Sequence, residues 1–391
     1  MKPKGWVDAY DFLIVPPPQP DELLSSWLTR LAFAHGYSLT TFISLFLRHD
    51  GSALSRTDID FREDTELLEI FSQKSGLPYE QIFQMSLRSE EGYLFECDHG
   101  LYPPNQIRKL KDRRTHFGLM YCPKCLMEDA HPYWRKQWRY RFYNACPRHK
   151  VFLTDRCWKC YKRVRFNKME PSDFPVYCSQ CGRDLRKTVA QKVPLDHLVG
   201  IDAIKWFNKG LNQGYFTIET MHIRSLFFFQ ASSILSRLLD RGERLQLHHF
   251  QMLEEYRQLY SKERYYHSNK ARSISKDFYL TAMVKHLFKS PCDNLVSFAI
   301  DNGLTHRDFV HGFQHVPFWY KSIIEESVPM QNTVGREISK SEVTGAIEYL
   351  VHLGEQATQE RTAEILGCHS TRNKGFSSLF HQFTVGLYPG D

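Results

Sequence analysis

The sequence predicts a mainly α-helical protein with a small metal-bound α/β centre, flanked by an amino-terminal helix-turn-helix bundle and a carboxyl-terminal helical domain. Apolar residues recur at intervals of three and four over most of the chain, and seven of its ten cysteines fall within one stretch of sixty residues. With 391 residues, 42% of them hydrophobic, the chain is long enough for two or three domains with their own cores. We expect these domains at residues 1–115, 116–190 and 191–391.

The amino-terminal domain is expected to be a small helical bundle. Asp21 follows a proline-rich run and is a candidate cap for a helix that ends at Gly36. Ser38 and Thr40 are candidate caps for a second helix, and helix, glycine turn, helix is the outline of a helix-turn-helix. A plain helical hairpin has the same outline, so the pattern leaves DNA reading by this segment open. Two amphipathic stretches would complete the bundle, at residues 65–75 and 79–87.

Eight metal-binding side chains form four pairs, each with two residues between its members. This spacing lets a tight turn direct both side chains at one ion, and four pairs supply two tetrahedral sites. Paired in sequence order, they give a three-Cys/one-His site and an all-Cys site. Both sets are complete and leave no position for substrate, so we expect two structural zinc ions. The ligands are Cys122, Cys125, Cys146, His149, Cys157, Cys160, Cys178 and Cys181.

Two other arrangements of these cysteines have to be weighed. Disulfides would need an oxidising compartment, and the opening residues MKPKGWVDAY show no secretory signal segment. Interleaved pairing, first with third and second with fourth, would give the cross-braced fold of RING-type ubiquitin ligases. That fold usually has a shorter gap than the seven residues 150–156 between its second and third pairs, so pairing in sequence order is favoured.

Positive charge is concentrated around the ligand pairs. Residues 101–190 contain 21 Lys and Arg against 7 Asp and Glu, whereas the rest of the chain has an acidic excess of 7. Such a field most simply favours nucleic acid phosphates. Within residues 131–145, aromatic and basic residues alternate, which predicts a strand with one aromatic face and one face of three arginines. The arginine row would track a phosphate backbone or contact acidic side chains of a protein. Candidate contact residues are Arg113, Arg114, Arg135, Arg139, Arg141, Arg372 and Lys374.

The carboxyl-terminal domain is expected to be helical throughout. Near its end, residues 342–353 predict one helix, and residues 360–367 are typical of the first helix and turn of a second helix-turn-helix. Its recognition helix would begin near Ser370, although Gly375 is a poor helix former. Apolar periodicity predicts the earlier helices of this domain at residues 195–211, 222–241, 246–260 and 276–289.

No catalytic set is evident in the sequence. The chain lacks a Walker phosphate loop, a GxSxG elbow, an HExxH motif and a compact acidic cluster. A zinc deaminase would need an open coordination position and a glutamate beside its first ligand, but His149 is flanked by Arg148 and Lys150. No apolar run approaches the ~18 residues of a membrane helix. We therefore expect a cytoplasmic binding protein without membrane contact, not an enzyme.

Two motifs resemble the TniQ/TnsD family of transposon target-selection proteins. Residues 20–32, PDELLSSWLTRLA, resemble the family's amino-terminal signature, an acidic and serine-rich start before a Trp-Leu-x-Arg-Leu-Ala helix. Residues 121–129, YCPKCLMED, with PYWR at 132–135 and CPRH at 146–149, are similar to its zinc segment, which continues through Cys157 and Cys160. The resemblance covers residues 20–185, and the rest of the chain is recognisable only as helical.

The resemblance implies a recruiter without chemistry of its own, which marks a DNA target in a prokaryotic cell and passes it to a TnsC-type AAA+ ATPase and then to the transposase. Shorter TniQ members of CRISPR-associated transposons bind an RNA-guided Cascade complex with its guide RNA and target DNA, and some act as homodimers. Longer TnsD members read an attachment site directly. At 391 residues the chain is nearer the shorter members, while the second helix-turn-helix keeps direct reading open.

Overall fold

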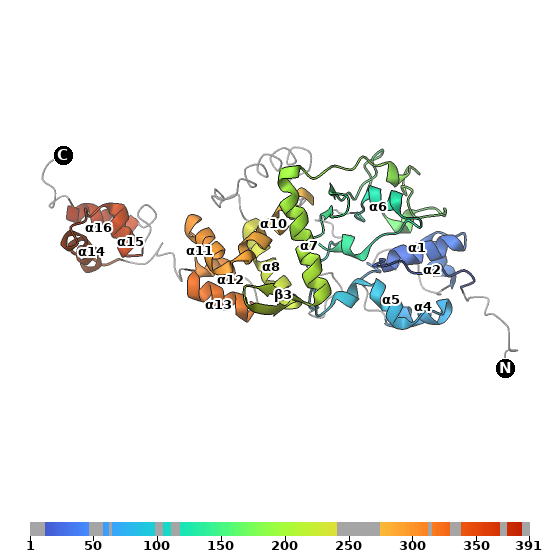
Figure 1. Cartoon of the computed structure of the whole chain (residues 1–391), viewed down its shortest axis with the longest axis horizontal. Helices are drawn as coiled ribbons and strands as arrows, with labels where there is room; N and C mark the ends of the chain where they lie inside the picture. The colour runs from blue at the N-terminus through green and yellow to red at the C-terminus, as the bar shows by residue number, and fades with distance from the viewer. Residues whose placement is uncertain are drawn as a thin grey trace. The chain divides into compact units, whose positions relative to one another are not determined.

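The computed structural model describes residues 12–46, 58–61, 65–97, 105–110, 118–240, 274–311, 315–328, 338–367 and 374–384. These residues are mainly helical and include two short antiparallel sheets (Figure 1). The chain divides into two compact units: the larger comprises residues 1–240 and 247–289, and the smaller comprises residues 241–246 and 290–391. The mainly α class is thus confirmed, and the three-part division into domains stays a prediction.

The amino-terminal helices follow the predicted pattern closely. Gly36 ends the first helix in the left-handed region, at φ 77°, and Tyr37 N–H then donates to the Ala32 carbonyl, which is the Schellman arrangement. Ser38 caps the second helix, because its Oγ accepts a hydrogen bond from Thr41 N–H at 3.3 Å. The helices are α1 (Leu24–Ala34), α2 (Leu39–Phe46), α4 (Thr65–Ser75) and α5 (Tyr79–Met85), followed by the 3-10 turn η1 (Leu87–Glu90).

Helix α1 is capped by a residue distant in sequence, so the expectation of a cap at Asp21 is wrong. Leu23 occupies the N-cap position and makes no side-chain bond, while Asp21 lies two residues earlier in a left-handed conformation. Asp60 supplies the acceptors instead: its carboxylate accepts Ser25 N–H at 2.7 Å and the Ser25 hydroxyl at 2.9 Å. The cap therefore depends on tertiary contact, which is consistent with burial of every residue of α1 from Leu24 to Phe33.

The segment with the ligand pairs contains mostly short elements. The predicted strand through residues 134–142 is wrong, because the 3-10 turn η2 (Lys136–Arg139) changes the direction of the chain in its middle. The two flanks bond to different partners, Arg135 to Glu22 and Tyr140 to Ile107, so the chain must change direction between them. Burial of the aromatic residues on this segment is confirmed. The elements are α6 (Pro123–Glu128), η2 (Lys136–Arg139), β1 (Ala145–Cys146), β2 (Val151–Phe152), η3 (Phe166–Lys168) and η4 (Leu185–Lys187).

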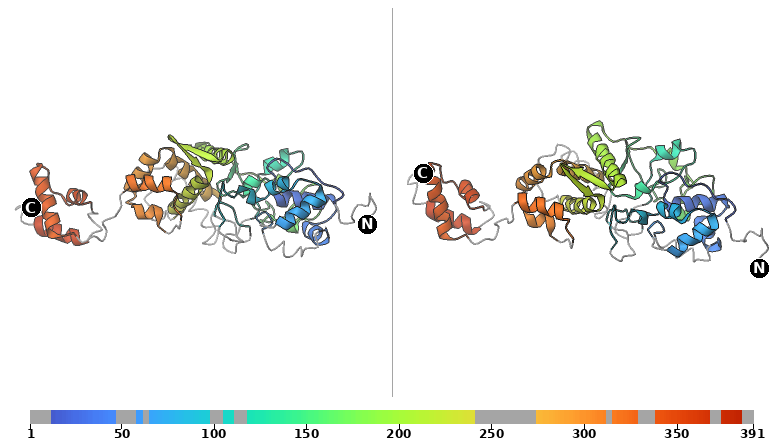
Figure 2. Two further views of the ribbon diagram at one scale, coloured as in Figure 1. Left: turned by 90° about the horizontal axis from the view of Figure 1, so that it is seen from below. Right: turned by 60° about the horizontal axis from the view of Figure 1, so that its bottom comes forward.

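A helical layer with a hairpin completes the larger unit. Helix α7 packs against α10 and the β3–β4 hairpin (Figures 1 and 2) through two glycines: a Cβ on Gly200 would lie 2.2 Å from the Phe278 ring, and one on Gly210 would lie 2.3 Å from the Phe216 ring. The helices match three of the predicted stretches, but the hairpin was not expected, and residues 246–260 lie outside the described part. The elements are η5 (Leu195–His197), α7 (Leu198–Gln213), β3 (Tyr215–Ile218), β4 (Met221–Arg224), α8 (Ser225–Asp240) and α10 (Ile274–Lys289).

The described part of the smaller unit is entirely helical. Its last three helices share a hydrophobic cluster that includes Val343, Leu350 and Phe376. A capping box between Ser339 and Glu342 begins α14, and the two helices expected at 342–353 and 360–367 are found within about two residues. No described helix has the length and apolar character to cross a membrane. The helices are α11 (Pro291–Asp301), α12 (His306–Val310), α13 (Phe318–Ser327), α14 (Lys340–His352), α15 (Gln359–Ile365) and α16 (Lys374–Thr384).

Candidate metal centres and their surroundings

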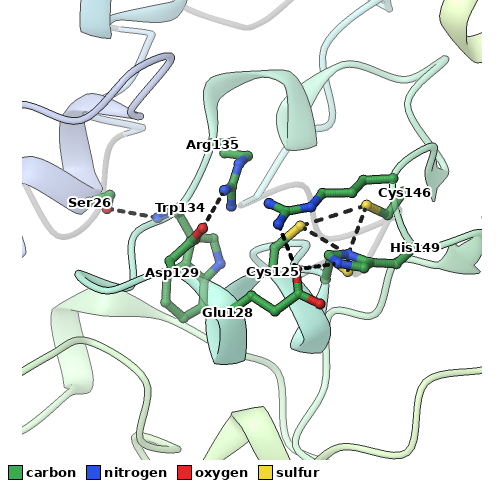
Figure 3. Close-up of polar contacts among 10 residues, drawn as sticks. Ser26, Cys125, Glu128, Asp129, Trp134, Arg135, Cys146 and His149 are labelled. Atoms are coloured by element: carbon green, nitrogen blue, oxygen red, sulfur yellow. Dashed lines mark hydrogen bonds and ion pairs between the residues drawn. The ribbon is translucent and has the colours of Figure 1, made fainter.

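The first four ligand residues meet at one point, here called the Cys/His cluster. Cys122 and Cys125 come from the start of α6, Cys146 ends β1, and His149 lies in the turn that leads to β2. The Nδ1 atom of His149 is 3.4 Å from the sulfur of each cysteine, and the sulfurs of Cys125 and Cys146 are 3.7 Å apart. Figure 3 shows the imidazole directed at these sulfurs.

The last four ligand residues form a second group, here called the all-Cys cluster. The sulfurs of Cys157 and Cys181 are 3.6 Å apart, as are those of Cys160 and Cys178, and all four lie within 4.8 Å of one another. The Cys/His cluster has three buried cysteines, whereas Cys181 of the all-Cys cluster is exposed. A solution chelator therefore has a more direct path to the second group than to the first.

Both clusters have the dimensions of a tetrahedral metal site. An ion bound about 2.3 Å from sulfur and 2.0–2.1 Å from nitrogen has S–S edges of about 3.8 Å and S–N edges of about 3.6 Å. The observed separations of 3.4–3.7 Å are close to both values. Burial raises the pKa of the Cys178 thiol to about 12, so a cation is needed to favour its ionised form. Each cluster could therefore hold one metal ion.

The arrangement decides between the pairings considered from sequence. The pairs join in sequence order, first with second and third with fourth, so the cross-braced arrangement is wrong. Disulfides are also excluded here, since an S–S bond requires about 2.05 Å and the cysteines of both clusters are free. The two ligand groups predicted from the spacing are thus brought together as expected, although the spacing alone could not exclude interleaving.

The Cys/His cluster has a second layer of charged residues on one side. The other ring nitrogen of His149, Nε2, lies 2.9 Å from a Glu128 oxygen, and that oxygen also accepts from Arg148 at 2.8 Å. Hydrogen bonding to His149 lowers the pKa of Glu128. A carboxylate behind a metal-binding histidine fixes the orientation and tautomer of the ring. In the sequence, Glu128 stands out only as part of the motif at residues 121–129, and its role depends on a contact that spacing does not reveal.

Arg135 lies between the clusters and the amino-terminal helices, not on an open surface. Its guanidinium is 2.8 Å from Asp129 (Figure 3). It also lies over the rings of Tyr133 and Trp138, at 4.5 and 5.1 Å from their centroids. The neighbouring Trp134 N–H donates to Ser26 Oγ on α1 at 2.9 Å, as Figure 3 also shows. The Arg135 side chain is thus enclosed by groups of its own segment and is only 12% exposed.

Arg139 contradicts the expected row of three exposed guanidinium groups. Its side chain is 1% exposed and forms ion pairs with Asp58 and, at 2.8 Å, with Asp60. It also donates to the Arg108 carbonyl at 3.0 Å. Burial lowers the pKa of Arg139, but the two carboxylates outweigh it and raise that pKa overall. A phosphate cannot reach this group in the folded protein, because the acidic partners from residues 58–61 already occupy its donors.

The remaining candidate contact residues have different positions. Arg141 is 27% exposed and lies 3.8 Å from the Asp277 carboxylate on α10, so it also faces an acidic group of the chain itself. Arg113, Arg114 and Arg372 lie outside the described residues. Lys374 is the first residue of α16, and its side chain is not described. Nucleic-acid contact by these four residues stays a prediction.

The motif of residues 20–32 has a structural explanation. Glu22 and Arg30 form a buried ion pair at 2.6 Å, and Ser26 donates to Glu22 at 2.9 Å. Arg30 also donates to the Pro17 carbonyl, and the Trp27 indole to that of Pro16, both within 2.9 Å. These bonds hold the proline-rich lead-in against α1, and the backbone of Leu23 pairs with Trp134. The two motifs that were read separately in the sequence therefore form one packed structure.

Comparison with protein families gives a match in this part of the chain. The TniQ family model matches residues 13–153, which include α1, α2, α4, α5, α6 and all ligands of the Cys/His cluster. A search of curated proteins returned no match. The resemblance noted from residues 20–32 and 121–149 is confirmed by a comparison that covers both motifs at once. The chain thus carries a TniQ domain at residues 13–153.

Proposed function

We propose that this protein is a non-catalytic adaptor that selects the target site for a transposon. The observation that carries the proposal is the TniQ match over residues 13–153, since the family is one of transposition-associated target-selection proteins. The matched region contains a rigid junction between α1 and the Cys/His cluster, tied by the backbone pair of Leu23 with Trp134. A junction of this kind suits a protein that has to hold two partners in a fixed relation, because its parts need no rearrangement on binding.

The metal in both clusters is proposed to be zinc with a structural role. Sulfur and imidazole ligands at tetrahedral spacing are the donor set that zinc prefers, and four protein ligands leave no position for a substrate or water. The ions would join segments up to 27 residues apart, Cys122 with His149 for example, in a region with few regular elements. Their binding free energy would therefore be part of the folding free energy of this region.

The partners are proposed to be an RNA-guided Cascade complex, with its guide RNA and target DNA, and a TnsC-type AAA+ ATPase. Helix α1 cannot provide a surface for either, since it is buried from Leu24 to Phe33. Helix α2 has buried positions at Leu39, Phe42 and Ile43 and an exposed Leu45, and it contains no Lys or Arg. A helix without cations is poorly suited to a phosphate backbone, so we assign α2 to protein contact, with TnsC as the proposed partner.

Affinity purification tests the adaptor role. The tagged chain would be expressed with the Cascade components and TnsC, and the material retained on the tag would be identified by mass spectrometry. We expect Cascade to co-purify with the wild-type chain and TnsC to be lost in the variant Leu45→Glu, which alters only an exposed position of α2. The matched control is Tyr79→Glu on α5. If neither complex is retained and integration proceeds in cells that lack the chain, the adaptor role is refuted.

Direct reading of an attachment site is the second candidate. It is favoured by the three carboxyl-terminal helices, whose shared cluster of Val343, Ile347, Phe376 and Phe380 gives them a core of their own. A helix-turn-helix of α15 and α16 is proposed on this basis. A direct reader would retard one specific duplex without any partner, whereas an adaptor would bind duplexes weakly and without selection. As some TniQ members act as homodimers, we also propose that this chain forms one, and light scattering of the same samples would test this.

A further inference from the structure

Three turns of the two clusters share one backbone conformation. In each, the residue after the second ligand of a pair is left-handed: Lys150 at φ 52°, Tyr161 at φ 55° and Gly182 at φ 65°. The N–H of that residue donates to the carbonyl of the first ligand, at 2.8, 3.0 and 2.9 Å respectively. The two turns of the all-Cys cluster share a further hydrogen bond: Cys157 N–H donates to the backbone carbonyl of Lys162, and Cys178 N–H donates to that of Arg183.

Tyr161 is therefore unusual for its position. Glycine adopts a left-handed conformation without strain, and Gly182 does so in the equivalent turn, whereas a bulky side chain there costs on the order of 1 kcal/mol. Burial does not offset this cost, because Tyr161 is 71% exposed. A residue that is strained and makes little contact with its own protein points to a role outside it.

Other exposed rings lie on the same cluster. Trp158, in the same turn as Tyr161, is 38% exposed, and its indole N–H donates to the Asp184 carbonyl at 3.0 Å. Tyr177, 39% exposed, is the bridge partner of that same Asp184. The Trp158 ring is thus held in place by a hydrogen bond at its edge while part of it remains open to solvent. We call Trp158, Tyr161 and Tyr177 the exposed rings.

The segment that carries the exposed rings is rich in cations, and few of these cations are neutralised. Residues 156–192 contain ten Lys and Arg against three Asp and Glu. Among the described residues, only Arg156 and Arg186 of these ten form an ion pair. Burial lowers the pKa of Arg163, and the charges of Arg156 and Arg165 lower it further. The other exposed cations of this stretch are Lys159, Lys162, Arg165, Lys168, Arg183, Lys187 and Lys192.

We infer that the exposed rings and the cations around them bind single-stranded nucleic acid, with unpaired bases stacked on the rings and phosphates beside the cations. Exposed rings among cations are the combination that proteins use for unpaired strands. In a duplex the base faces are already stacked on each other, so they are not available to stack on the exposed rings. The inference does not depend on which transposition partners the protein has, and purified components test it separately from the proposed function.

The test is fluorescence anisotropy with labelled dT and U oligonucleotides of about 20 nucleotides, longer than typical single-strand sites, beside a duplex of equal length. The variant Tyr161→Gly should keep both metal ions and a melting temperature at least equal to wild type, because glycine suits the backbone there. We expect its affinity for the better single strand to fall about fivefold or more, the loss of one stacked base. Tyr161→Phe, which retains the ring, should bind like wild type.

Two further variants make the result specific. Lys150→Gly relaxes the same conformation in the Cys/His cluster without removing a ring, so it should leave the preference for single strand over duplex unchanged. Lys159→Gln with Lys162→Gln should reduce the logarithmic salt slope on a single strand by about 1.4, because each phosphate contact contributes about 0.7. Wild-type affinity of Tyr161→Gly for both single strands would overturn the inference, as would loss of metal from that variant.

Discussion

Replacement of Arg139 separates a structural role from the phosphate contact that its sequence context suggests. Arg139→Met keeps an unbranched stem of similar length but removes the charge and all donors. The structure predicts that this change unfolds the protein more readily and has no effect on nucleic-acid binding by molecules that remain folded. A phosphate contact would have the opposite result, with unchanged stability and a flatter salt slope.

The expected magnitude follows from the burial of the ion pairs. Arg139 is 1% exposed, and its partners Asp58 and Asp60 are 12% and 1% exposed at their side chains. Removing one member of a buried ion pair costs about 3–5 kcal/mol, because the remaining charge is left without a partner. This is a large part of the roughly 5–15 kcal/mol that typical domains have available. Because Asp60 also caps α1 through Ser25, the start of α1 should be destabilised together with the segment that contains Arg139.

The destabilisation should also depend on pH. Burial raises the pKa of Asp60 to about 6, and loss of Arg139 removes the charge that lowers it, so that pKa should rise further. A carboxyl whose folded pKa exceeds its unfolded value favours folding below the unfolded pKa, and this contribution is lost as pH rises through the folded pKa. The free energy difference between Arg139→Met and wild type should therefore be smaller at about pH 5.5 than at about pH 7.5.

Urea unfolding at constant zinc, followed by tryptophan fluorescence, measures this difference. Arg141→Met is the matched control: its guanidinium is 27% exposed and 3.8 Å from its partner, so its loss should cost about 1 kcal/mol or less. Restoring part of the stability by adding Asp60→Asn to Arg139→Met would identify the orphaned carboxylate as the cause. The reasoning is refuted if Arg139→Met unfolds like wild type and the two arginine variants are indistinguishable.

Four further outcomes are expected. Cys146→Ser should reduce bound zinc from two ions per chain to one, as measured by elemental analysis. In the wild type, a chelator should remove the ion of the all-Cys cluster first, because Cys181 is exposed. Simultaneous release of both ions would contradict the second expectation. Because the pKa of Glu128 is lowered in the folded protein, its carboxylate stabilises the cluster above its unfolded pKa, and this contribution is lost as pH falls through the folded pKa. On acidification, Glu128→Gln should therefore release zinc at a slightly higher pH than wild type, as measured by a colorimetric zinc assay. An unchanged curve of zinc release against pH would argue against the contact. Gly210→Ala would place a Cβ 2.3 Å from the Phe216 ring and should lower stability by about 1–3 kcal/mol in calorimetry, in contrast to the control Gly345→Ala, whose Cβ would meet nothing within 4 Å.

Local features of the fold were well predicted because their causes are local. The helix end at Gly36 needs only one residue that adopts φ 77° without strain, and the cap at Ser38 needs only an oxygen within three residues of its donor. Apolar periodicity placed helices at 65–75 and 79–87 for the same reason, and the structure has them at 65–75 and 79–85. The hairpin at 215–224 was missed, since its two strands of four residues carry too short a pattern to stand out between two long helices.

The ligand pairs show where sequence reasoning reaches its limit. Two residues between ligands fix the turn, so the sequence by itself determined which eight side chains gather in pairs at the two clusters that could hold metal. Which pairs join depends on the path of the chain between them, and only the tertiary structure decided that sequence order holds and interleaving does not.

The same division explains the error at Arg139. The alternation of aromatic and basic residues correctly marked one buried set, but it could not reveal acidic side chains from about 80 residues earlier that bury Arg139 as well. A count of charged residues in a sequence cannot show which of them form ion pairs, because these pairs form only when the chain folds. The sequence therefore determined that the middle of the chain is cationic. The tertiary structure decided which cations remain exposed, and these include most of those near the all-Cys cluster, where acidic residues are few.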